Sequence, residues 1–138
     1  MNGRENRIYL WLLSTVVVAF FGACASTTEE IPEDLNPAEY FQLAQNVVSD
    51  EGNYALAIRY YQSFIDSYPE DLQRVVIAKY EIAFLNYKQG KKDLARSQFE
   101  ELLSYYDEEG ASVLPRWPQV LTAKILNRID DESLNGEE

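Results

Sequence analysis

Apolar residues in the middle of the chain recur with the period of an amphipathic helix. In residues 54–68 the apolar positions follow the i, i+3, i+4, i+7 spacing of one helix face: Tyr54, Ala57, Ile58, Tyr61, Phe64, Ile65 and Tyr68. Because Pro69 disfavours helical backbone at the residue before it, this helix is expected to end near residue 67. The same period predicts further helices over residues 37–49, 71–88, 92–106 and 116–130. Asp71 is expected to cap the helix over 71–88.

The helical pattern is repeated within the chain. A shift of 38 residues carries Gly52 onto Gly90, and it carries three more residues onto chemically similar partners: Ala57 onto Ala95, Tyr61 onto Phe99 and Tyr68 onto Tyr106. A glycine permits the positive φ with which one helix ends and the next reverses over it. A small residue, Ala57 or Ala95, lets two helices cross closely. The aromatic residue four positions later then fills the space beyond that crossing. Each unit therefore predicts an αα-hairpin that stacks on its neighbour.

Residues 37–107 resemble two tetratricopeptide (TPR) repeats, on the spacing Gly52, Ala57, Tyr61 and the closing Tyr68 and Pro69. They are similar to the repeats of cell-envelope TPR lipoproteins, namely the BamD type of the outer-membrane β-barrel assembly machine and the periplasmic TPR domain of cell-division coordinators. BamD-type proteins resemble a longer array of about five repeats, and the usual TPR period is 34. The first helix of the second unit is therefore expected to be longer by about one turn.

The resemblance implies an all-α, antiparallel helix-hairpin solenoid of two repeats plus a C-terminal capping helix. In such stacks the first helices of the repeats line a concave face where peptides bind. Tyr40, Tyr80 and Tyr87 lie on those helices, so they are candidate partner-binding residues, with ordinary packing as the alternative. The last helix is expected to cover the second repeat with one apolar face, composed of Val120, Leu121, Ile125 and Ile129.

The start of the chain has the features of an export signal. Arg4 and Arg7 precede the apolar residues 8–21. As a helix this run spans about 21 Å at about 1.5 Å per residue, whereas a transmembrane helix needs about 20 apolar residues. A short apolar run between basic and small residues is typical of a signal peptide.

The sequence FGAC, residues 21–24, resembles a bacterial lipobox. This resemblance implies a lipoprotein signal peptide over 1–23, cleavage between Ala23 and Cys24, and lipid attachment at Cys24. Cleavage after Ala25 and an uncleaved anchor are the alternatives. The lone cysteine fits lipid attachment, because exported proteins usually avoid a free exposed thiol. The implied location is the periplasmic side of a bacterial membrane, the outer membrane more than the inner.

The remaining segments are read from composition. Residues 24–36 are polar and acidic and contain Pro32, so they predict a flexible tether before the TPR-like domain over 37–130. Residues 131–138 predict a disordered acidic tail. Lys88–Lys92 form a small basic spot at a predicted turn, suited to a helix C-terminus or an anionic partner.

Composition removes several classes of function. The net charge of −11 leaves no basic patch for nucleic acid, and the chain has no histidine and one cysteine. The carboxylates lie on predicted linker, helix surface and tail, so no catalytic, cofactor or metal site is expected. The sequence favours a non-enzymatic, lipid-anchored adaptor that binds an envelope protein partner, such as the β-barrel assembly machinery, or a second copy. The alternative is a ligand-binding or transport-accessory lipoprotein with a cavity in the helical stack.

Overall fold

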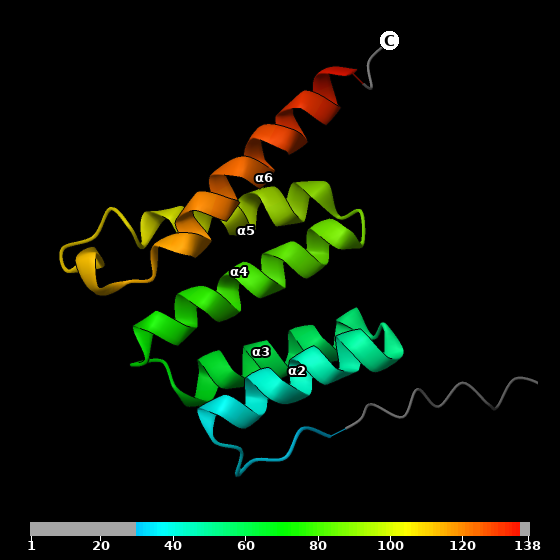
Figure 1. The fold of residues 1–138 in the computed structure, drawn as a ribbon, viewed down its shortest axis with the longest axis vertical. Coiled ribbons are helices and arrows are strands. Elements are labelled where there is room, and N and C mark those ends of the chain that lie inside the picture. Colours follow the sequence, from blue (N-terminus) through cyan, green and yellow to red (C-terminus); the bar gives the residue numbers. More distant parts are fainter. Residues whose placement is uncertain (1–29, 136–138) are drawn as a thin grey trace, which may run out of the picture. The chain divides into compact units, whose positions relative to one another are not determined.

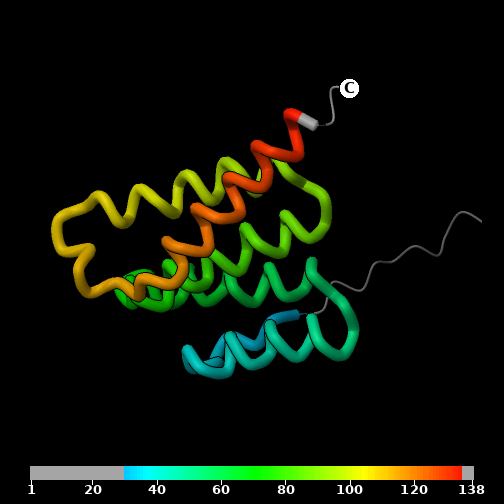
Figure 2. Tube along the Cα trace, turned by 45° about the horizontal axis from the view of Figure 1, so that its top comes forward, coloured from blue at the N-terminus to red at the C-terminus, as the bar shows by residue number. Residues whose placement is uncertain are grey.

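The computed structural model describes residues 30–135, in which every regular element is helical. In chain order the elements are α2 (Pro37–Glu51), α3 (Tyr54–Ser67), α4 (Leu72–Lys88), α5 (Lys92–Ser104), the short 3-10 helix η2 (Ala111–Val113) and α6 (Arg116–Asn135). Consecutive helices run antiparallel, and the α2–α3 and α4–α5 turns lie at the same end of the stack, as Figure 1 and Figure 2 show. This arrangement confirms the predicted all-α helix-hairpin solenoid. The expected leader and Cys24 lie outside the described residues.

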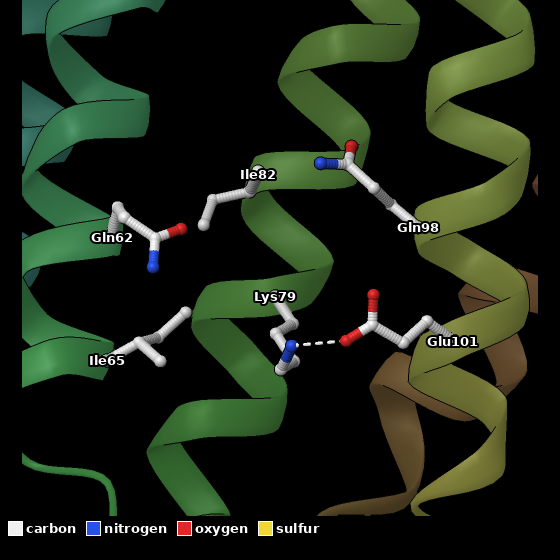
Figure 3. A pocket seen from close by; sticks show the side chains of 6 residues that line it. All are labelled: Gln62, Ile65, Lys79, Ile82, Gln98 and Glu101. Atoms are coloured by element: carbon white, nitrogen blue, oxygen red, sulfur yellow. Dashed lines mark hydrogen bonds and ion pairs between the residues drawn. The ribbon is translucent and has the colours of Figure 1, made fainter.

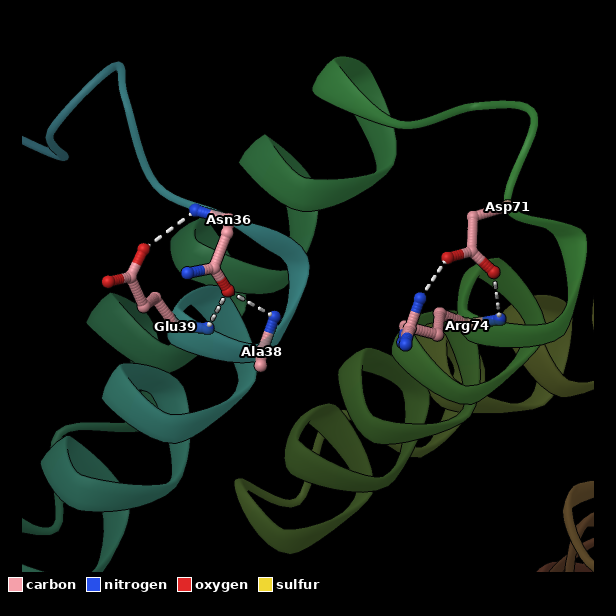
Figure 4. Close-up of polar contacts among 5 residues, drawn as sticks. All are labelled: Asn36, Ala38, Glu39, Asp71 and Arg74. Carbon is pink, nitrogen blue, oxygen red and sulfur yellow. Dashed lines mark hydrogen bonds and ion pairs between the residues drawn. The ribbon is translucent and has the colours of Figure 1, made fainter.

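Side-chain caps fix where α2 and α4 begin, and Asn53 caps α3 by accepting from the Leu56 N–H at 3.1 Å. The Asn36 side chain accepts hydrogen bonds from the backbone N–H groups of Ala38 and Glu39 at 3.0 and 3.2 Å, and the Glu39 carboxylate accepts from the Asn36 N–H at 2.7 Å (Figure 4). This reciprocal capping box satisfies N–H groups that no helical carbonyl can reach. Asp71 caps α4 by accepting from the Arg74 N–H at 3.3 Å and by pairing with the Arg74 guanidinium, which confirms its predicted role.

The two glycines of the sequence repeat reverse the chain as predicted. Gly52 has φ 63° and Gly90 has φ 76°, both in the left-handed region. A Cβ at either position would meet no atom within 4 Å, so the requirement for glycine is conformational and not steric. The two turns therefore use the same backbone device to pair α2 with α3 and α4 with α5.

Two clusters of buried apolar side chains fill the stack. The first joins α2, α3 and α4, and the second joins α4, α5 and α6. Ala57 and Ala95 are fully buried in the first and second cluster respectively, and the aromatic rings four residues later, Tyr61 and Phe99, are buried beside them. The shift of 38 residues thus relates positions that share burial as well as chemistry.

Helix α4 belongs to both clusters. Val75, Ala78, Ile82 and Leu85 enter the first cluster, whereas Val76, Tyr80 and Ala83 enter the second. The two sets occupy different sides of the same helix. One helix therefore joins the two hairpins into one compact unit.

The folded unit begins earlier than predicted. The flexible tether was expected to extend to residue 36, but Ile31 and Leu35 pack against the first cluster. The Tyr68 hydroxyl also donates a hydrogen bond to the Leu35 carbonyl at 2.9 Å. These contacts fix residues 31–36 on the domain, so the predicted boundary at residue 37 is wrong.

The last helix is longer than predicted. Residues 131–135 were assigned to a disordered tail, yet α6 continues to Asn135. Lys92 pairs with Glu132 at 2.8 Å, and the Tyr87 hydroxyl donates to the same carboxylate at 3.3 Å. Arg96 also pairs with Asp130. The acidic end of α6 is therefore held by side chains of α4 and α5, which the composition of the segment does not reveal. Residues 136–138 lie outside the described range.

Removing an aromatic ring from the second cluster should destabilise α5 and α6 more than α2 and α3. We expect Phe99→Ala to lower the free energy of unfolding by about 3–5 kcal/mol, because a fully buried ring leaves a cavity. Amide exchange should accelerate more in α5 and α6 than in α2 and α3. Urea unfolding and hydrogen exchange measure these effects, with Leu94→Ala, at a 47% exposed position of the same helix, as the control. An equal decrease in the free energy of unfolding in Phe99→Ala and Leu94→Ala would contradict the assignment of Phe99 to the core.

Candidate functional site

A shallow groove of about 140 Å³ crosses α3, α4 and α5. Each helix contributes two of the six side chains that line it, and Figure 3 shows them: Gln62, Ile65, Lys79, Ile82, Gln98 and Glu101. Four of the six are polar or charged. Small-molecule sites usually enclose about 300–1,000 Å³ and are mostly apolar, so this groove is too small and too polar for a drug-sized apolar ligand.

Lys79, the positively charged residue of this groove, is paired with a carboxylate of the same domain. Lys79 pairs with Glu101 at 2.7 Å and lies 5.4 Å from the centre of the Tyr105 ring. Burial alone lowers the pKa of Lys79, but the hydrogen bond to Glu101 and the nearby Glu101 and Tyr105 groups outweigh it, so the pKa is raised. Lys79 is therefore a charged structural link between α4 and α5.

Two further hollows lie near the ends of the helices. One of about 300 Å³ borders η2 and the start of α6, where Arg116 and Gln119 are among its lining residues. The other, of about 220 Å³, lies between residues 31–33 and α3, with Asp66 on its wall. Both are open to solvent, so neither is the deep, enclosed apolar cavity that a ligand-carrying lipoprotein would need.

Two of the three predicted partner-binding tyrosines lie in the core. Tyr40 is 1% exposed and packs edge-on against Phe64, with ring centres 6.2 Å apart. Tyr80 is 6% exposed, its ring stacks on that of Phe84 with centres 5.9 Å apart, and it is T-shaped to the ring of Trp117 with centres 5.1 Å apart. The burial of Tyr40 and Tyr80 favours ordinary packing, the alternative to a partner-binding role for these side chains.

The third predicted tyrosine is used inside the molecule. Tyr87 is half-buried beside the second cluster, and its hydroxyl donates a hydrogen bond to Glu132 of α6. Its polar end therefore links α4 to α6. The structure does not bring Tyr40, Tyr80 and Tyr87 together on one free surface, because two of them are in the core and the third is engaged at the end of α6.

Sequence reasoning missed Glu81, a partly buried carboxylate of α4. Burial raises the pKa of Glu81, and the charge of Glu81 contributes, after burial, to raising the pKa of Tyr61 and Tyr80. It stands between a buried tyrosine and a buried isoleucine in the sequence, and no motif distinguishes it from the exposed glutamates.

The apolar residues of α6 divide between two faces. Ile125 and Ile129 are buried in the second cluster, which confirms that α6 covers the second repeat. Val120 and Leu121 were predicted to share that face, but they are 50% and 37% exposed. At about 100° per residue, the buried stripe passes instead through Pro118 and Thr122. This division leaves an apolar surface on α6 that the sequence pattern did not separate.

No metal centre is found among the described residues, 30–135. These residues contain no group of three or more His, Cys, Asp and Glu side chains placed to hold a metal ion. No helix among them is both long and apolar enough to cross a bilayer.

Removing the charge of Glu81 should stabilise the domain at neutral pH. Because its pKa is raised in the folded state, the folded chain binds the proton more tightly than the unfolded chain, so stability is lost as the pH rises from the ordinary carboxyl pKa through the raised one. We expect Glu81→Gln to raise the melting temperature at pH 7 and to have a smaller effect below the ordinary carboxyl pKa. Glu70→Gln, at an exposed turn position, is the control. If the melting temperature of Glu81→Gln exceeded that of the wild type by the same amount at every pH, the raised pKa of Glu81 could not be the cause.

Comparison with known proteins agrees with this geometry. Residues 40–71 and 78–108 each match the family model of the tetratricopeptide repeat. An uncharacterized protein of Treponema pallidum (strain Nichols) is 32% identical over 131 residues, which is 94% of this chain and 52% of the relative, so the chain spans about half the relative's length. No solved structure matches the chain. The two segments that match the tetratricopeptide repeat therefore coincide with the two helix hairpins, α2 with α3 and α4 with α5.

Proposed function

We propose that this protein is a non-enzymatic adaptor of the bacterial cell envelope, held at a membrane by lipid on Cys24 and binding a protein partner through its helical stack. The observation that carries the adaptor role is the pair of tetratricopeptide repeats, a family that typically binds proteins. The similarity to a bacterial protein supports the cellular context.

The proposed anchor rests on the sequence before the described residues. An apolar run over residues 8–21 is followed by the lipobox-like residues 21–24, which end in the single cysteine of the chain. Each buried methylene of a lipid contributes about 0.8 kcal/mol, and two or more acyl chains hold stably where one does not. A diacylated, palmitate-bearing Cys24 would therefore keep the domain at the membrane, on the periplasmic face and at the outer membrane more than the inner.

The structure favours this role over that of a ligand carrier. The described residues form two buried apolar clusters, and the groove across α3, α4 and α5 and the hollow beside η2 are both open to solvent. A carrier would need an enclosed apolar cavity. We further propose outer-membrane protein assembly as the process served, on the similarity of the repeats to those of BamD-type lipoproteins.

Replacing Cys24, whose sulfur would carry the lipid, tests the proposed anchor. We expect Cys24→Ala, expressed in bacteria as the full chain, to lose palmitate label and to move from the membrane fraction to the soluble fraction. Ser26→Ala is the control, since it leaves the lipobox-like residues intact. Mass spectrometry of the wild-type chain should find an N-terminus at Cys24 with added lipid. A Cys24→Ala chain that still partitions with membranes, or a wild-type N-terminus at Ser26, would show the lipid proposal to be wrong.

The process is tested by capture from membranes. We expect the full-length protein, crosslinked gently before solubilisation, to co-purify with a β-barrel assembly protein in amounts well above those with an unrelated outer-membrane lipoprotein. Capture of other envelope partners without any barrel-assembly component would reject this process while leaving the adaptor role in place.

A further inference from the structure

We infer that residues 31–35, the strap, release from α2 and α3 as a unit while α2 keeps its cap. The structure holds the closed form, in which the strap lies on the first hairpin just before α2 (the blue segment of Figure 1). This conformational device goes beyond the proposed adaptor role. Its opening does not depend on lipid, whereas its effect on the reach of the domain rests on the proposed anchor at Cys24.

Few contacts hold the strap closed. Ile31 and Leu35 are only partly buried against the first cluster, and the Tyr68 hydroxyl donates to the Leu35 carbonyl at 2.9 Å. Glu33 and Asp34 between them are exposed. Within residues 30–135, no hydrogen bond joins the backbone of residues 31–34 to a helix. A segment with so little burial and so few backbone hydrogen bonds opens locally, at a lower free energy than the whole domain unfolds.

The strap does not lie flush on the helices beneath it. A hollow of about 220 Å³ is lined by the strap on one side and by α2 and α3 on the other, through Ile31, Pro32, Glu33, Tyr40, Ser63, Asp66 and Ser67. This hollow is open to solvent, so water already reaches the underside of the strap. Release therefore exposes little apolar surface beyond the side chains of Ile31 and Leu35.

Charge also opposes the closed form. Glu33 of the strap and Asp66 of α3 line the same hollow, and no lysine or arginine is among its lining residues. Asp66 accepts a hydrogen bond from the Gln62 amide at 3.1 Å, but neither carboxylate is in an ion pair within the described part of the chain. Two unpaired carboxylates across one hollow repel each other, and salt screens that repulsion.

The cap of α2 supplies the pivot. Asn36 and Glu39 form the reciprocal capping box with hydrogen bonds in which no strap residue takes part (Figure 4). Asn36 has extended backbone, φ −77° and ψ 163°, as expected for the residue before Pro37. The start of α2 is thus satisfied whether the strap is closed or released, so the motion can end at residue 35 without fraying the helix.

The second repeat contains a matched contact. Tyr106 corresponds to Tyr68 under the shift of 38 residues, and its hydroxyl donates to the Pro115 carbonyl at 2.7 Å, just before α6. The closing tyrosine of each repeat therefore binds the backbone of a segment that leads into a helix. The segment before α6 is also held by Leu114, which is buried, whereas the apolar side chains of the strap are only partly buried. The strap is the more weakly held of the two segments.

Release would change how far an anchored domain reaches. With lipid on Cys24, six residues of sequence, 25–30, separate the anchor from the closed strap, and release adds the five residues 31–35. At about 3.4 Å per residue, these five residues lengthen the maximum reach by about 17 Å. A partner that lies farther from the membrane would then select the released form.

Proteolysis of the full-length protein tests the release. The endopeptidase Glu-C cuts after Glu33 when the strap is open, so the rate of this cut follows the released population. We expect Tyr68→Phe, which loses one hydrogen bond, to raise the rate by about threefold or more. Tyr106→Phe, which loses the matched hydrogen bond of the second repeat, should leave the rate unchanged.

A charge variant tests the repulsion across the hollow. Asp66→Asn keeps an acceptor for Gln62 and removes one negative charge, so it should slow the cut after Glu33 by about twofold at low salt. The difference from the wild type should vanish in about 1 M sodium chloride, where the Debye length is about 3 Å. Asp50→Asn, at an exposed position near the end of α2, is the control and should not change the rate.

Cleavage after Glu81, inside α4, reports unfolding of the whole domain and separates it from release of the strap. Equal acceleration at Glu33 and Glu81 in Tyr68→Phe, the same acceleration at Glu33 in Tyr106→Phe, or an Asp66→Asn rate no lower than that of the wild type would each overturn the inference. The membrane partition of Cys24→Ala tests the anchor separately: a chain that passes the proteolysis tests but keeps Cys24→Ala on membranes retains the strap and loses the anchor.

Discussion

Helix α4 must bury two apolar faces at once, and the rest of the structure depends on this constraint. Its residues alternate between the core shared with α2 and α3 and the core shared with α5 and α6. A helix with a single apolar stripe would close one hairpin and leave the other as a separate, marginal unit. The small residues Ala78 and Ala83, both fully buried, allow close packing on both sides. Two hairpins thereby become one folded domain.

The end of the stack is held differently. Helix α6 buries a narrow stripe through Ile125 and Ile129, and its last turns are held by charge, with Glu132 against Lys92 and Tyr87. The hydrogen bond from Lys92 outweighs partial desolvation and lowers the pKa of Glu132, and the pKa of Lys92 is raised by the same contact. The contribution of the pair is therefore lost as the pH falls through the lowered carboxyl pKa or rises through the raised amine pKa. Because exposed pairs are weak and screened by salt, this end of the domain is the one that solution conditions can loosen.

Local pattern predicted the hairpins because their causes are local. The turn at Gly52 needs a residue tolerant of positive φ, and the crossing at Ala57 needs a small side chain, so both are visible in the sequence and recur 38 residues later. Burial of Tyr40 and exposure of Val120 were not predictable in the same way. A tyrosine or valine on a helix face looks identical whether the neighbouring helix covers it or passes beside it, and only the packing decides.

The corrected boundary at residue 31 changes what the proposed anchor does. A tether running to residue 36 would let the domain range over a wide volume, but Ile31 and Leu35 pack on the domain, so only six residues of sequence, 25–30, separate the proposed anchor from the first of these contacts. A chain spans at most about 3.4 Å per residue, so a lipid on Cys24 would keep Ile31 within roughly 24 Å of the bilayer surface. A partner could then reach the helical stack only close to the membrane, and its effective concentration would rise if it were itself a membrane protein. With lipid on Cys24, so short a tether would favour membrane-embedded partners over freely diffusing ones.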